Sequence, residues 1–172
     1  MRKIIVIGTI HNYPSCRRQL KQILKKLNPD QVLVEIIDAD LKKRKFKNYP
    51  KEFIDAYEWA VKNKKIINGF DVPIRIEKPF FKKELRQINR DMANVISKHD
   101  WKEWNKSKYD DEIYGLTKNV IYVKKHKLRQ RKMLVNIKRT MIPRGKILVL
   151  TGIGHLNFFE RYLKIADFLF RR

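Results

Sequence analysis

Short, strongly apolar runs alternate with amphipathic segments along this chain of 172 residues. Three of the runs cover residues 3–7, 31–34 and 146–151, and they are rich in Ile, Leu and Val. Runs of this length and composition are typical of strands that are buried on both faces of a parallel sheet. Between the first two runs, residues 14–27 place apolar side chains on one helical face and Lys and Arg on the other. Residues 1–36 therefore predict a βαβ unit with a right-handed crossover.

The rest of the chain predicts further helices and one irregular strand. The apolar spacing favours helices over residues 51–63, 120–141 and 157–170. A strand is expected over 72–76, at an irregular or edge position because it contains a proline. The segment around 80–118 is expected to form a small helical cap. The fold class is therefore α/β: a single domain over 1–172, with a mainly parallel sheet flanked by helices.

The first and the last predicted strands are followed by the same pattern, Gly-x-x-His. Residues 8–11 read Gly-Thr-Ile-His and residues 152–155 read Gly-Ile-Gly-His, while Glu35 ends the run at 31–34. The carboxyl ends of parallel strands share the edge of the sheet at which ligands bind. Glycine just past a strand permits tight turns and close approach. The turn glycines of the two motifs are Gly8, Gly152 and Gly154.

Two histidines and a carboxylate at one edge are a common ligand set for a catalytic divalent metal ion. We therefore predict a site formed by His11, Glu35 and His155, with zinc, manganese or cobalt as candidate ions. Alternatively, Glu35 is a general base beside two histidine ligands. The alternatives are an incidental histidine in each turn and a solvated carboxylate at a strand that ends early.

Two further residues are candidates for this site. Arg129 extends an apolar stripe of helix 120–141 that contains Met133 and Met141, so it either points into the site or extends outward into solvent. Inside the site, a guanidinium would bind a substrate carboxylate or stabilise an oxyanion. Glu77 follows the expected strand 72–76 and is either a fourth ligand, a general base or a surface residue.

These motifs resemble the TraB/PrgY family and its TIKI metalloprotease relatives, within the wider erythromycin-esterase/ChaN-like fold. The resemblance rests on the two Gly-x-x-His motifs, on Glu35 after the second strand and on Arg129 four residues before Met133. Residues 77–79, Glu-Lys-Pro, are similar to an Asp-Arg-Pro-like turn of that family. The chain is short for the family, with little room for its inserted helical subdomain or membrane tail. The resemblance implies a metal-dependent hydrolase, peptidase-like, that acts on a peptide or a small amide or ester.

Composition adds limits on partners and location. The net charge is +23, with 27 Lys and 14 Arg spread over nearly every segment. A basic surface of this kind attracts nucleic acid non-specifically, although the scattered, lysine-rich charge favours an ordinary solvated surface. We expect no membrane segment and no signal peptide, and the single cysteine suits a cytoplasmic location. Two alternatives to the metal-dependent hydrolase stay open: a metal-free His/Glu esterase-like hydrolase, and a basic non-enzymatic protein that binds nucleic acid or acidic partners.

Overall fold

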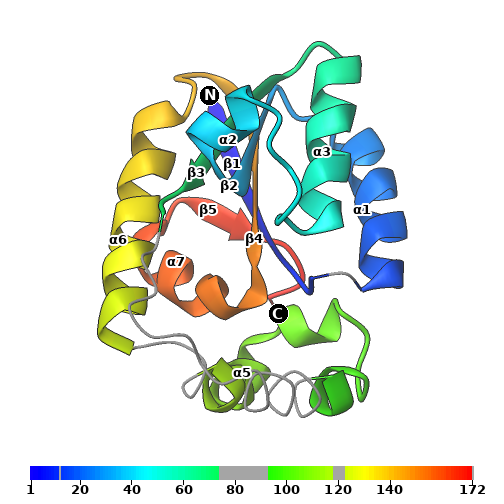
Figure 1. The fold of residues 1–172 in the computed structure, drawn as a ribbon, viewed down its shortest axis with the longest axis vertical. Coiled ribbons are helices and arrows are strands. Elements are labelled where there is room, and N and C mark those ends of the chain that lie inside the picture. The colour runs from blue at the N-terminus through cyan, green and yellow to red at the C-terminus, as the bar shows by residue number, and fades with distance from the viewer. Residues whose placement is uncertain (12, 74–92, 118–122, 172) are drawn as a thin grey trace.

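The computed structural model describes residues 1–11, 13–73, 93–117 and 123–171, and these contain one five-stranded sheet in the order β3-β2-β4-β1-β5 (Figure 1). All neighbouring strands in it are parallel, which confirms the predicted α/β class. The strands are β1 (Arg2–Thr9), β2 (Gln31–Ile37), β3 (Ile66–Asp71), β4 (Gly145–Gly152) and β5 (Ala166–Phe168).

The strands that carry the two Gly-x-x-His motifs lie side by side. β1 pairs with β4 along its whole length, from Arg2 opposite Gly145 to Thr9 opposite Gly152. β2 flanks β4 on the other side, with Val34 opposite Leu150. The ends of β1, β4 and β2 therefore meet at one edge of the sheet, as the sequence predicts.

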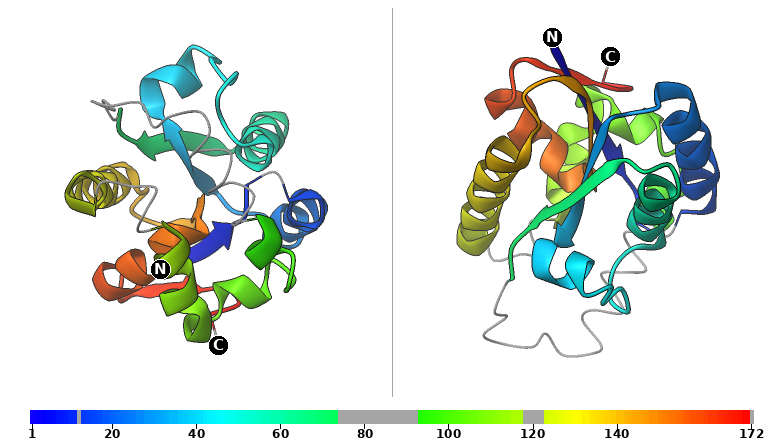
Figure 2. Two further views of the ribbon diagram at one scale, coloured as in Figure 1. Left: turned by 60° about the horizontal axis from the view of Figure 1, so that its bottom comes forward. Right: turned by 90° about the horizontal axis from the view of Figure 1, so that it is seen from above.

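Both faces of the sheet are covered by helices, and Figure 2 shows α1 and α3 on one side with α6 and α7 on the other. Alternate residues along each strand face opposite layers: Ile5 packs with the core under α1 and α3, while Ile4 and Val6 pack with the core under α6 and α7. Because both faces are buried, the strands read as continuous apolar runs. The helices are α1 (Pro14–Leu27), α2 (Asp38–Lys42), α3 (Lys51–Lys62), α5 (Asp110–Thr117), α6 (Val123–Thr140) and α7 (Leu156–Tyr162).

The described part of the predicted cap, residues 93–117, crosses the end of the sheet near β1. It contains α5 and the short 3₁₀ turns η1 (Glu103–Asn105) and η2 (Ser107–Tyr109). Asn105 is fully buried and bonds both backbone groups of Gly8, accepting from its N at 3.0 Å and donating to its O at 2.9 Å. A Cβ on Gly8 would stand only 2.6 Å from Leu156 Cδ1, so the glycine allows this close packing.

Two predicted elements differ in the structure. The third strand is β3, Ile66–Asp71, rather than 72–76, of which 74–76 lie outside the described residues. Asn68 and Gly69, which resemble a turn in sequence, lie inside it. Asn68 accepts from Gln31 Nε2 at 2.8 Å, and Gly69 leaves room for the backbone of Ile36.

The last helix is also shorter than the expected 157–170. α7 ends at Tyr162, and the chain then returns as the edge strand β5, which pairs with β1. A strand of three residues is too short to show an alternation that competes with a helical stripe. In the described part of the chain, no helix is long and apolar enough to cross a bilayer.

Candidate active site at the carboxyl edge of the sheet

Glu35, in β2, is the centre of a buried hydrogen-bond network. Its Oε2 accepts from Thr151 Oγ1 at 2.7 Å and from the Gly152 backbone N at 2.6 Å. Its Oε1 accepts from Arg129 Nη2 at 2.9 Å and lies 3.1 Å from His155 Nε2. The four contacts take up the roughly four lone-pair positions of a carboxylate.

These partners keep Glu35 ionised. Burial alone would raise the pKa of this carboxyl, since the residue is 6% exposed. The effect is outweighed by His155, by the charge of Arg129 and by the Gly152 N–H, and the pKa lies well below its usual range. Glu35 is therefore a fixed negative charge and is a poor donor or acceptor of a transferred proton near pH 7.

Arg129 supplies the matching positive charge from α6. Its Nε and Nη2 donate to the two carboxylate oxygens of Asp71 at 2.8 Å each, and Nη2 also bonds Glu35. The third nitrogen, Nη1, is 3.4 Å from His155 Nε2. The side chain is only 17% exposed, so the guanidinium fills the space between Glu35, Asp71 and His155.

His155 is held at both ring nitrogens. Its Nε2 faces Glu35, and its Nδ1 lies 3.1 Å from the Gln130 side-chain amide nitrogen. Because a carboxylate only accepts, Nε2 carries the hydrogen and Nδ1 accepts from Gln130. The ring also stacks on His126, with centroids 4.9 Å apart. Both ring nitrogens of His155 are therefore occupied by protein groups, and its side chain is only 6% exposed, so neither nitrogen faces open solvent.

His11 has a different environment, because one side of its ring is open. Its Nδ1 lies 2.8 Å from Glu52 Oε1, and its side chain is 45% exposed while that of Glu52 is wholly buried. Thr9 Oγ1 donates to the same Glu52 oxygen at 3.3 Å. Since the carboxylate accepts, Nδ1 carries the hydrogen and Nε2 presents its lone pair.

The charges around His11 favour its protonated form. Partial burial lowers the pKa of this imidazole, but the hydrogen bond to Glu52 and the charges of Glu35 and Glu52 outweigh burial and the opposing charge of Arg129. The net result is a pKa raised from 6.5. His11 is therefore a stronger base than an ordinary histidine.

Gly152 lies next to both His11 and Glu35. A Cβ built on Gly152 would lie 3.1 Å from His11 Nε2 and 3.5 Å from Glu35 Oε2. The structure thus gathers His11, Glu35, His155 and Arg129 at one edge. Glu77 lies outside the described residues.

The contacts of Glu35 and Arg129 decide how well a metal ion fits here. All positions of Glu35 are taken by other partners, and the Arg129 guanidinium occupies the place between Glu35 and His155 that a cation would need. Within the residues that the structure describes, no three His, Cys, Asp or Glu side chains form a metal-binding group. The arrangement does not fit an ion held by His11, Glu35 and His155, and that site stays a prediction that metal analysis tests.

Five residues of this network are absent from the sequence prediction: Thr9, Glu52, Asp71, Gln130 and Thr151. Glu52 had a usable signal, because it begins a stripe with Ala56 and Ala60 that is fully buried against the sheet. A carboxylate in line with two small buried residues indicates a buried charge that needs a partner. Asp71 and Gln130 carry no comparable pattern.

Comparisons with protein-family models, with curated proteins and with solved structures find no match to this chain. The resemblance to the TraB/PrgY family therefore stays a prediction from the motifs.

Proposed function

We propose that this chain is a hydrolase of ester or amide bonds that uses His11 as a general base and needs no metal ion. The observation that carries the proposal is the contact between His11 Nδ1 and the buried carboxylate of Glu52 at 2.8 Å. A carboxylate at Nδ1 fixes the ring and leaves Nε2 to accept a proton, as in many hydrolytic sites.

In the proposed reaction, His11 Nε2 takes a proton from a water molecule as the water oxygen attacks the carbonyl carbon. The buried charge of Glu52 stabilises the imidazolium that forms. When the tetrahedral intermediate collapses, the same Nε2 returns the proton to the leaving oxygen or nitrogen. The net change is the addition of one water across the ester or amide bond.

Arg129 is the candidate for stabilising the negative charge on the carbonyl oxygen. Of its three guanidinium nitrogens, only Nη1 bonds no carboxylate of the described residues. Asp71 and Glu35 hold the guanidinium in place, so it would not need to reorganise during the reaction. In this proposal Glu35 and Asp71 position Arg129, and His11 transfers the proton.

The proposal is tested with a panel of 4-nitrophenyl esters and chromogenic peptide amides. Wild type should hydrolyse at least one of them, and His11→Gln should lower kcat/KM by about 10²-fold or more. The matched control is His99→Gln, since His99 packs with Trp104 and Tyr109 in the cap segment. Equal activity of wild type and His11→Gln, or no hydrolysis of any probe, would overturn the proposal.

A further inference from the structure

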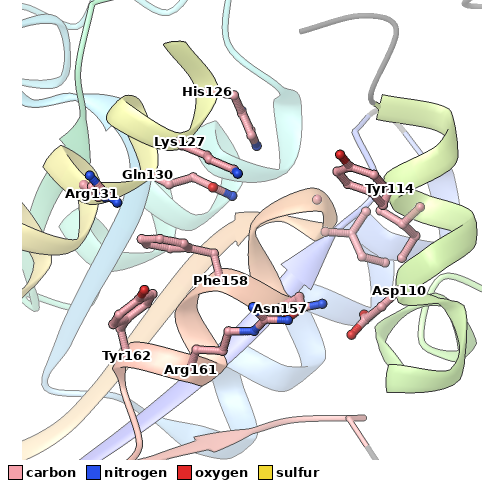
Figure 3. A pocket seen from close by; sticks show the side chains of 13 residues that line it. Asp110, Tyr114, His126, Lys127, Gln130, Arg131, Asn157, Phe158, Arg161 and Tyr162 are labelled. Carbon is pink, nitrogen blue, oxygen red and sulfur yellow. The ribbon is translucent and has the colours of Figure 1, made fainter. Parts of the chain in front are cut away.

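A cavity of about 380 Å³ opens between α5, α6, α7 and the segment that joins β4 to α7 (Figure 3). Its volume is at the lower end of the roughly 300–1,000 Å³ that is usual for small-molecule sites. A hollow of this size takes a small molecule rather than a strand of nucleic acid or a protein segment.

The cavity borders the proposed active site but does not include its catalytic base. His126 and Gln130 form part of its wall, and both of them contact His155. Neither His11 nor Glu35 lines it. A ligand in this cavity would therefore lie behind His155, with the side chains of His126 and Gln130 between it and the His155 ring.

The lining has an excess of positive charge. Lys127 and Arg131 come from α6 and Arg161 comes from α7, and none of the three has an ion-pair partner among the described residues. The carboxylate in the lining, Asp110, is already held by two hydrogen bonds from Arg171 at 2.7 and 2.6 Å. Three cations around one hollow repel one another, and an anion would relieve that repulsion.

Aromatic side chains provide the apolar part of the lining. Tyr114 stands on the α5 wall, while Phe158 and Tyr162 stand on the α7 wall with ring centroids 4.8 Å apart (Figure 3). Tyr114 and Tyr162 are 58% and 52% exposed, which is high for large rings. Rings placed on both sides of a hollow offer surfaces on which a planar group can stack.

We propose that this cavity is a second binding site, for a small organic anion that joins a planar ring to a carboxylate or phosphate group. The ring lies among Tyr114, Phe158 and Tyr162, and the anionic group is held by Lys127, Arg131 and Arg161. The proposal goes beyond the hydrolase proposal and does not depend on it, because it is measured by binding alone.

The test is an NMR titration at fixed ionic strength with three probes: phenyl phosphate, benzoate and neutral phenol. Phenyl phosphate or benzoate should bind one site, with a Kd on the order of 1 mM for a probe of this size. Phenol should bind about tenfold more weakly or worse, because it has the ring without the charge. A preference between the two anions separates a phosphate ligand from a carboxylate ligand. Equal binding of phenol and both anions, or no saturable binding of either anion, would overturn the proposal.

Variants locate the binding. Lys127→Gln and Arg161→Gln should each weaken the anion by about tenfold, the loss typical of one charge-assisted hydrogen bond. Asn157→Phe keeps all three cations but fills the cavity that Asn157 lines, so it should abolish binding. The matched control is Lys132→Gln, an exposed lysine of α6 outside the lining. If Lys132→Gln weakens binding as much as Lys127→Gln, the anion is held by general surface charge and the proposal fails.

Discussion

Replacing Arg129 with methionine keeps the apolar stem of the side chain and removes its charge. Glu35 and Asp71 then lose the cation that they share, and no other Lys or Arg of the described residues pairs with either carboxylate. Breaking a buried ion pair costs about 3–5 kcal/mol, and the 17% exposure of Arg129 favours the lower end, about 3 kcal/mol. With a urea m-value of about 2 kcal/mol per M, the unfolding midpoint should fall by about 1.5 M.

The same variant should gain affinity for zinc. It leaves the carboxylates of Glu35 and Asp71 and the Nε2 atom of His155 around the space that the guanidinium filled, and these are zinc ligand types. At zinc concentrations about 100 times the Kd, binding would restore about 2.7 kcal/mol of stability. The control is Arg131→Met, an exposed arginine of the same helix. The reasoning is refuted if Arg129→Met loses less than about 1 kcal/mol, or if zinc stabilises wild type and the variant equally.

Three other changes test the site and its support. Glu52→Gln should lower the pKa of His11, measured by NMR titration, because it removes a hydrogen-bonding carboxylate that raises it. Hydrolysis needs neutral His11, so the rate of hydrolysis by wild type should rise with pH through a pKa above 6.5. In Glu52→Gln the same rise should occur at a lower pH. An unchanged pH profile would argue against His11 as the base. Gly152→Ala should lower kcat/KM about tenfold or more, because the added Cβ presses on His11 Nε2. Its free energy of unfolding should change by less than about 1 kcal/mol, because the backbone φ of −63° suits alanine. Gly8→Ala should instead lose about 1–3 kcal/mol in urea unfolding, because its Cβ meets Leu156.

The sequence predicts the parts of the fold that are strongly periodic. The apolar runs at 3–7, 31–34 and 146–151 become β1, β2 and β4, because strands buried on both faces need continuous apolar residues. The amphipathic segment at 14–27 becomes α1. Where a strand is at the edge, as β3 and β5 are, fewer positions are buried and the pattern weakens. The two misplaced elements are both edge strands.

For the site, the sequence identifies the residues that motifs mark, but it does not show their bonding. The strand ends place His11, Glu35 and His155 at one edge, and the stripe of α6 points to Arg129. Whether a strand-end carboxylate faces a metal ion or a guanidinium depends on the register of a helix far away in the chain. No local sequence pattern predicts that register. The contacts of Glu35 with Arg129 and of His11 with Glu52 can therefore be identified only from the structure.

Turnover of an ester by chelator-dialysed wild-type protein tests the central claim most directly. The protein is dialysed against a chelator, its metal content is measured in the same sample, and kcat/KM is compared before dialysis, after dialysis and after zinc, manganese or cobalt is added. If His11, supported by Glu52, performs the proton transfer without a metal, kcat/KM stays unchanged after dialysis has lowered the metal content to less than about 0.1 equivalent, and adding an ion does not raise it. At that content a metal-dependent enzyme would keep only about a tenth of its rate. Loss of hydrolysis on dialysis, with recovery on adding one equivalent of a divalent ion, would contradict it and favour the metal site of His11, Glu35 and His155.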